Sequence, residues 1–268
     1  MNILLVNDDG VHAPGILNLF HQLRCEHRVI ILAPLQERSA TGHTLTLDNP
    51  LRLVEVGEDI YGLSGFPADC TLMGIAFLQK KLAINFDIVI SGINRGANLG
   101  QDIFYSGTVA AAREAAFRGL PAIAISSCMD FHSQNNSENY YDTASILIKK
   151  ILQLDVHREI PQYGILNINV PWCSLESIAG IRFTKLGFRH YSEDILERSD
   201  FRGKDYFWIG GVYRGFQPDP ESDCQAIEDK LVSVGILKIS DFSAELTLEK
   251  TKNDYTKLKQ AIQRLQLI

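Results

Sequence analysis

The chain has 268 residues, of which 46% are hydrophobic and 22% charged, as in ordinary globular proteins. The formal net charge of −6 and the pI near 5.7 argue against a general nucleic-acid-binding protein, which normally carries a basic face. No apolar run approaches the ~20 residues that a membrane span needs. Residues 1–7 form a short apolar run without a basic leader, so we expect no secretory signal.

The cysteines indicate a reducing environment. They are scattered, odd in number and without a CxxC pair: Cys25, Cys70, Cys128, Cys173 and Cys224. We therefore expect thiols used as small core side chains, rather than disulfides or a zinc site, in a cytoplasmic protein.

Strand-like and helix-like patterns alternate through the first half of the chain. In chain order they predict a strand over 2–7, a helix over 16–26, a strand over 27–34, a helix over 67–82, a strand over 86–92, a helix over 107–120 and a strand over 121–126. This alternation indicates right-handed crossovers. The expected fold is therefore α/β, with a Rossmann-like, doubly wound and mostly parallel sheet.

The second half follows another pattern. A helix is expected over 140–152 and a strand over 164–171; residues 172–240 suggest strands and turns, for example 205–211 and 231–240, before a helix over 254–266. We expect a single domain, 1–268. It would combine an α/β core carrying the active-site loops, 1–165, with a β-rich extension and C-terminal helix, 166–268, that serves oligomerisation.

Three unusual loops follow the predicted parallel strands. They are "NDDGVHAPG" at 7–15, "LQERSATGHT" at 35–44 and "SGINRGANLGQDIFYSGT" at 91–108, each rich in Gly, Ser, Asn and Asp. Because parallel strands bind ligands at their carboxyl ends, all three loops should meet at one edge of the sheet.

Asp8 and Asp9 lie where the first strand becomes a loop. Adjacent carboxylates repel each other, and hard oxygen ligands suit Mg²⁺ or Mn²⁺. Ser39 and Asn94 occupy comparable positions on the other loops and can add neutral oxygens. The alternative is that the two aspartates cap the first helix.

Ser106, Gly107 and Thr108 form a turn that opens a helix. Free N–H groups, hydroxyls and the positive end of the helix dipole make such a turn a phosphate site, although a plain N-cap explains it equally. His12 and His43 lie on two of the loops, either as proton donors or substrate contacts, or as loop hydrogen-bonding groups.

Together these segments resemble the SurE family, also called survival protein E or stationary-phase survival protein. The resemblance rests on "NILLVNDDGVHAPGI" (2–16), "RSATGHTLTL" (38–47) and "SGINRGANLGQDIFYSGTVAAA" (91–112), with "LNINVP" (166–171), "YFWIGG" (206–211) and "SDCQAI" (222–227) as later landmarks. It covers most of the chain.

The resemblance implies a metal-dependent phosphatase acting on nucleoside 5'- and 3'-monophosphates, and on short polyphosphate in some members. It implies one Mg²⁺ or Mn²⁺ per subunit, held by Asp8, Asp9, Ser39 and Asn94. It also implies a homodimer or homotetramer, with no nucleic-acid polymer or membrane as partner. We assign phosphate or substrate contacts to Asn7, Gly42, His43, Asn98, Ser106, Gly107 and Thr108.

Our hypothesis is that Asp8 and Asp9 are catalytic: they stay ionised beside a cation, and a metal-activated water attacks phosphorus. One rival is an enzyme in which Asp8 is phosphorylated, as in haloacid-dehalogenase-like phosphatases, although those place the second aspartate two residues later. The other rival is a nucleotide- or metal-binding α/β sensor without turnover.

Overall fold

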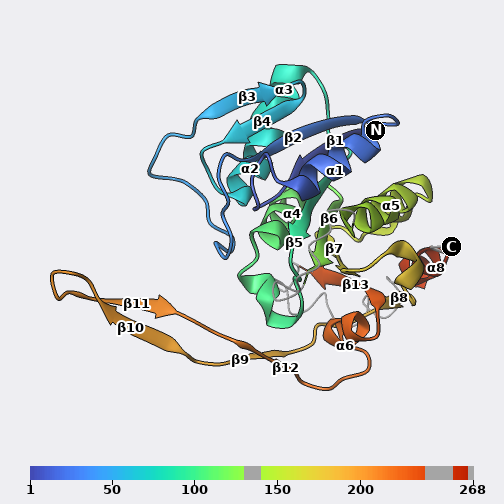
Figure 1. Ribbon diagram of the computed structural model, residues 1–268. Coiled ribbons are helices and arrows are strands. Elements are labelled where there is room, and N and C mark those ends of the chain that lie inside the picture. The colour runs from blue at the N-terminus through green and yellow to red at the C-terminus, as the bar shows by residue number, and fades with distance from the viewer. Residues whose placement is uncertain (130–139, 239–255, 265–268) are drawn as a thin grey trace, which may run out of the picture.

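The computed structural model describes residues 1–129, 140–238 and 256–264 (Figure 1). In this part of the chain one large sheet has the strand order β3-β4-β2-β1-β5-β6-β7-β13-β8. Its strands are β1 (Asn2–Val6), β2 (Arg28–Pro34), β3 (Leu53–Gly57), β4 (Ile60–Leu63), β5 (Ile88–Arg95), β6 (Ala122–Cys128), β7 (Gly164–Pro171), β8 (Gly180–Phe183) and β13 (Leu231–Lys238).

The strands from β4 to β7 in this order run parallel. Strand β3 joins β4, and β13 joins β7, in antiparallel pairs. The predicted α/β fold with a mostly parallel sheet is therefore confirmed.

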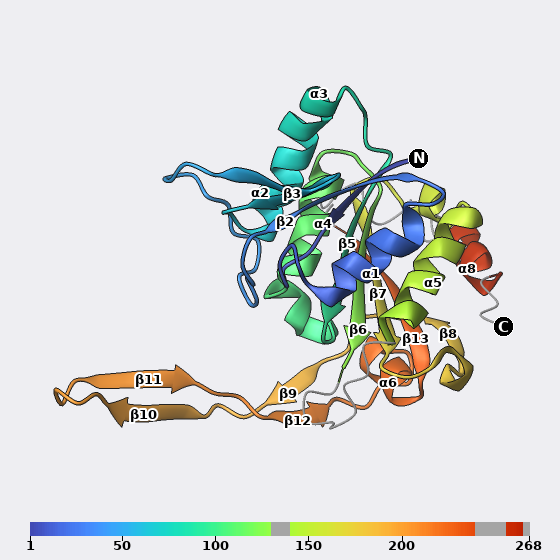
Figure 2. The same ribbon diagram turned by 45° about the horizontal axis from the view of Figure 1, so that its top comes forward.

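Helices cover both faces of the sheet (Figure 2). On one face lie α1 (Pro14–Leu23) and α5 (Tyr140–Gln153); on the other lie α2 (Pro67–Met73), α3 (Gln79–Leu82) and α4 (Gly107–Phe117). Strand β1 shows why its sequence is apolar at successive positions. Ile3 and Leu5 pack into the first core, whereas Leu4 and Val6 pack into the second.

The predicted helix over 67–82 is divided. Between α2 and α3 a π-helical turn, η1 (Gly74–Leu78), interrupts the α-helical hydrogen bonding. The hairpin of β3 and β4 and the short helix α6 (Asp223–Glu228) were not among the predicted elements. Strand β3 is mostly exposed at a sheet edge, so its sequence lacks a long apolar run.

The strand order has a switch point beside β1. From β1 the chain moves to β2 and β4 on one side, then returns to place β5 on the other side of β1. Ligands of open parallel sheets bind at such a switch point, outside the carboxyl ends of the two strands. Here those ends carry Asp8 and Asp9 after β1, and Asn94 near the end of β5.

The C-terminal extension is not separate from the core sheet. The expected division after residue 165 falls within β7, and β13 and β8 continue the same sheet. Strand β13 lies in the predicted 231–240 segment, and α8 (Thr256–Gln263) in the predicted 254–266 helix. Residues 239–240, 254–255 and 265–266 of these predictions lie outside the described residues.

A long two-stranded arm, residues 189–216, projects from the body in Figures 1 and 2. At its root β9 (Arg189–Tyr191) pairs with β12 (Tyr213–Phe216), and farther out β10 (Ile195–Ser199) pairs with β11 (Asp205–Ile209). The arm exposes several large apolar side chains, among them Ile195, Leu196, Phe201, Phe207, Trp208 and Ile209. Within the described residues no helix has the length and apolarity needed to cross a membrane.

Candidate active site

A tight turn follows β1 and carries the two aspartates. The Asn7 side chain closes it: Nδ2 donates to the Gly10 carbonyl at 2.9 Å, and Gly10 N–H donates back to Oδ1 at 3.2 Å. Gly10 has φ +102°, where a side chain would be strained. Asn7, which we expected to contact substrate, is fully buried here and shapes the turn.

The Asp8 carboxylate lies against the first turn of α4. Thr108 Oγ1 donates to Asp8 Oδ1 at 2.5 Å, and the backbone N–H groups of Gly107 and Thr108 also donate to this carboxylate. Burial raises the pKa of Asp8, and these hydrogen bonds offset the rise only in part. The positive end of the α4 dipole therefore faces one of the two aspartates.

Gly107 is needed because Asp8 approaches so closely. A Cβ at residue 107 would lie 2.8 Å from Asp8 Cβ. Ser106 is the N-cap of α4, its Oγ accepting from Val109 N–H at 3.0 Å. The turn thus has a cap, and Asp8 rather than an external anion receives the N–H groups that we expected to be free for phosphate. The alternative of capping at the first helix is not observed, because the N-cap residue of α1 is Ala13 and no side chain caps this helix.

Asp9 is partly buried beside Asp8. Its Oδ2 accepts from the Arg95 backbone N–H at 3.0 Å. Burial, and then repulsion by Asp8, raise the pKa of Asp9 to about 7 despite this hydrogen bond. Glu37 adds further repulsion. The turn therefore collects negative charge that a cation would relieve.

Asn94 follows an irregularity in the pairing of β5, at the same edge of the sheet. Pairing with β6 shifts register between Ser91 and Asn94. Gly92 permits β5 to approach β6 closely, since a Cβ at residue 92 would lie 2.2 Å from the Ile125 carbonyl oxygen. Asn94 Nδ2 donates to the Gly96 carbonyl at 2.9 Å, which leaves the amide oxygen as the end suited to a cation.

The second loop is tied directly to the aspartate turn. Arg38 N–H donates to the Asp8 carbonyl at 2.7 Å, and Ser39 is the next residue after Arg38 in the chain. Ser39 is exposed and its hydroxyl donates to Glu37 Oε1 at 2.7 Å, so the hydroxyl oxygen can still act as an acceptor.

His43 and Gly42 tie this loop to α4 and the residues before it. His43 Nε2 lies 3.0 Å from Glu114 Oε2, and Gly42 N–H donates to the Tyr105 carbonyl at 2.9 Å. Burial of Glu114 raises its pKa, but hydrogen bonds from His43 and Arg118 outweigh it and the net shift is downward. His43 thus makes a loop-to-helix contact, whereas His12 is exposed.

Asn98 is buried beneath the third loop. Its Nδ2 donates to Ser126 Oγ at 2.7 Å, and its N–H donates to Asn169 Oδ1 at 2.8 Å. Its carbonyl accepts from the side chains of Asn167 and Asn169. The structure therefore uses Asn98 to fasten the loop onto β6 and β7.

The donor set fits a hard divalent cation. Asp8, Asp9, Asn94 and Ser39 present only oxygen, and two carboxylates of raised pKa lie together. In the described ranges there is no cluster of three or more His, Cys, Asp or Glu side chains arranged for a metal. A cation here would rest on two carboxylates, neutral oxygens and water, as Mg²⁺ often does.

Comparison with known proteins agrees with these loops. The sequence model of the family described as "Survival protein SurE" matches residues 3–193. The chain belongs to the SurE family.

Relatives within SurE match along most of the chain. A "5'-nucleotidase SurE" of Fervidobacterium nodosum is 44% identical over 93% of this chain and 95% of its own length. Another from Geobacter sulfurreducens is 44% identical over 87% of this chain and 86% of its own. The crystal structure of the SurE protein from Aquifex aeolicus superposes with a TM-score of 0.76 at 34% identity, covering 94% of this chain and 98% of that one.

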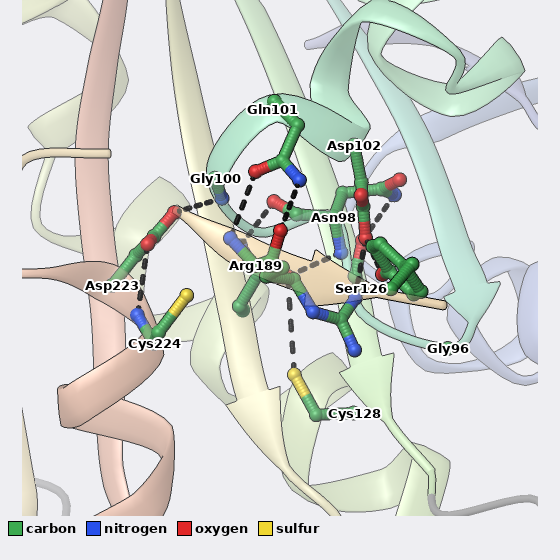
Figure 3. A network of polar contacts seen from close by, with 12 residues as sticks. Gly96, Asn98, Gly100, Gln101, Asp102, Ser126, Cys128, Arg189, Asp223 and Cys224 are labelled. Carbon is green, nitrogen blue, oxygen red and sulfur yellow. Dashed lines mark hydrogen bonds and ion pairs between the residues drawn. The ribbon is translucent and has the colours of Figure 1, made fainter. Parts of the chain in front are cut away.

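Sequence reasoning missed a set of residues that anchor the third loop. They are Tyr191 and, as labelled in Figure 3, Gln101, Asp102, Arg189 and Asp223. Gln101 and Asp102 stand within the segment 91–112, so their position in this segment was a usable signal. Arg189, Tyr191 and Asp223 lie more than 80 residues away along the chain, and no local pattern links them to the site.

Proposed function

We propose that this protein is a metal-dependent nucleotidase that releases phosphate from nucleoside 5'-monophosphates and 3'-monophosphates. The observation that carries the proposal is the pair Asp8 and Asp9, crowded together at the switch point of a doubly wound sheet. The relatives named 5'-nucleotidase support the same reaction class. Short polyphosphate is a second substrate class that we propose on the family resemblance alone.

We propose that Asp8, Asp9, Ser39 and Asn94 hold one Mg²⁺ or Mn²⁺. The chemistry that such a cation supplies is polarisation of a phosphoryl oxygen and a lower pKa of coordinated water. Thr108 and the α4 N-terminus keep Asp8 in a single orientation toward the site. Preorganisation of this kind lowers the cost of binding the transition state.

We propose that Asp9 orients the attacking water, because it is less buried than Asp8. Ser106 keeps its hydroxyl hydrogen, since Oγ acts as acceptor toward Val109, and that hydrogen can donate to a phosphate oxygen.

The geometry disfavours a phosphorylated Asp8. Asp8 is 4% exposed and its carboxylate already accepts from Thr108, so in-line attack on phosphorus would break that bond. A sensor without turnover is disfavoured by charge: binding a phosphate gains nothing from two repelling carboxylates.

The test is phosphate release from a panel of nucleoside 5'- and 3'-monophosphates and tripolyphosphate, in EDTA and then in excess Mn²⁺ or Mg²⁺. We expect metal-restored release by the wild type and loss of it in Asp8→Asn. Asp87→Asn is the control, because Asp87 accepts from the Asn2 N–H at the start of β1, at the other end of this strand from Asp8. Nucleotide binding without release under every metal would favour the sensor, and a trapped phospho-aspartate would favour the rival enzyme.

We further propose that the arm contacts a second copy of the chain, giving a homodimer or homotetramer. The arm exposes large apolar side chains, including Trp208 at 62% and Ile209 at 91%, beyond what an isolated surface normally carries. We place the protein in the cytoplasm, in keeping with five free thiols.

A further inference from the structure

The loop between β5 and α4 is held from two directions. Its first part bonds to the core: Gly96 N–H donates to the Ser127 carbonyl at 2.9 Å, and Asn98 bonds to Ser126. Its second part is the single-turn helix η2 (Gly100–Phe104), whose start bonds to the C-terminal extension instead (Figure 3).

Asp102 in η2 is bound by the root of the arm. Arg189 forms an ion pair with Asp102 Oδ2, and the Tyr191 hydroxyl donates to the same oxygen at 2.5 Å. The Arg189 guanidinium also lies 4.5 Å from the ring centroid of Tyr213. The Arg189 and Asp102 side chains are only 18% and 22% exposed, so water screens this pair less than one on an open surface.

The two residues before Asp102 are bound in the same way. Gln101 exchanges two hydrogen bonds with the Arg189 backbone, at 2.6 and 2.9 Å. The Asp223 carboxylate accepts from Gly100 N–H at 2.8 Å and from Gly187 N–H at 2.7 Å, and so joins η2 to the segment that leads into β9. Residues 100–102 therefore take their position from the arm root and α6.

Asp102 passes this position on to the turn before α4. Its carbonyl accepts from Tyr105 N–H at 3.0 Å and from Ser106 N–H at 3.1 Å. Ser106 caps α4, and the next two residues, Gly107 and Thr108, hold the Asp8 carboxylate. A continuous set of hydrogen bonds thus runs from the arm root through Asp102 to Asp8.

We infer that Arg189 is a positioning residue of the active site, which fixes the Asp8 carboxylate through Asp102 and the turn at 105–108. Arg189 acts through these residues and touches no reacting group. The inference rests on the proposed nucleotidase function. If Arg189 acts in this way, cation affinity and turnover depend on the contacts between the arm root and η2.

The test compares Arg189→Met with Arg182→Met. Arg182 also lies in the extension and also makes an ion pair, to Asp229 at 2.8 Å, but these residues are not part of the route to Asp8. We expect Arg189→Met to weaken Mn²⁺ binding, titrated without substrate, by about 10–100-fold, as for residues that support metal ligands. The kcat/KM should fall to a similar extent, and Arg182→Met should match the wild type.

Rescue and coupling separate positioning from a general loss of stability. Arg189→Lys keeps a charge for Asp102 and should recover part of the Mn²⁺ affinity. Asp102→Asn combined with Arg189→Met should weaken binding no more than either change alone, because the two side chains act in sequence. Tyr191→Phe removes one hydroxyl and should show a smaller loss of the same sign, which keeps the test available if Arg189→Met does not fold.

Hydrogen exchange supplies a readout that needs neither metal nor substrate. Amides of 100–108 should exchange faster in Arg189→Met, with β1 unchanged. Mn²⁺ affinity and exchange equal to those of Arg182→Met would overturn the inference, even if the melting temperature fell. Absence of phosphate release by the wild type would instead contradict the proposed function, and the exchange comparison would still decide on positioning.

Discussion

Thr108 Oγ1 donates to Asp8 Oδ1 across 2.5 Å, joining residues that are 100 positions apart. The bond connects the first turn of α4 to the loop after β1. Together with the N–H groups of Gly107 and Thr108, it fixes the orientation of the Asp8 carboxylate.

Removing the Thr108 hydroxyl should therefore make the Asp8 carboxylate less fixed in orientation, without removing any of the proposed metal ligands. We expect Thr108→Val to lower Mn²⁺ affinity by about 10–100-fold, as loss of a bond to a metal ligand typically does. Thr108→Ser keeps the hydroxyl and should retain most of the affinity. Equal Mn²⁺ titrations for Val and Ser variants would show that the bond does not position Asp8.

The raised pKa of Asp9 predicts how stability depends on pH without a cation. Burial first, and Asp8 second, raise the folded-state pKa to about 7 from an ordinary 3.8. Ionisation is thus less favourable in the folded chain, so the contribution of Asp9 to stability should be greatest below about pH 4, fall as the pH approaches 7, and level off above it. Urea unfolding in EDTA between pH 5 and 8 measures this slope.

Asp9→Asn should flatten that slope and raise the unfolding midpoint at pH 8, whereas Asp87→Asn should keep it. Since a cation binds the ionised carboxylate, Mn²⁺ affinity of the wild type should rise with pH up to about 7 and then level off. An affinity that is constant from pH 5 to 8 would contradict the raised pKa.

The closeness of Gly107 to Asp8 predicts that a methyl group is not tolerated. In Gly107→Ala the new Cβ meets Asp8 Cβ at 2.8 Å and Pro67 Cγ at 3.0 Å. Overpacking of this kind costs about 1–3 kcal/mol of stability, and displacement of Asp8 should remove most phosphate release. Gly57→Ala is the control, because its nearest neighbour, Ile60 Cδ1, is 3.5 Å away. Wild-type turnover in Gly107→Ala would refute the tight contact.

The exposed apolar side chains of the arm predict that a charged residue placed there weakens the association between copies of the chain. Ile209 is 91% exposed, so Ile209→Asp costs the isolated chain little, but it should disrupt an apolar contact between copies and lower the mass in solution. Leu47→Asp changes a side chain that is 84% exposed outside the arm and should leave the mass unchanged. Light scattering after size exclusion measures both; an unchanged mass for Ile209→Asp would remove the arm from the interface.

The sequence by itself determined the α/β class, most strands and helices of the core, and the edge of the sheet at which we propose the site. These follow from local causes. A strand covered on both faces, such as 2–6, must be apolar throughout, and polar loops at strand ends mark the ligand edge of a parallel sheet. The family resemblance then supplied the expected ligands at that edge.

Only the tertiary structure decided how the individual groups are used. Asn7 and Asn98 lie in polar loops where substrate contacts are expected, but in the folded chain their side-chain amides bond to Gly10 and Ser126. Likewise, the local sequence at the α4 N-terminus is typical of an anion site, whereas in the structure its N–H groups bind the Asp8 carboxylate from a distant loop. Arg189 became relevant because the arm root packs on η2, 87 residues away from it along the chain. Such pairings depend on which loops the sheet order brings together, and no local period or motif records that.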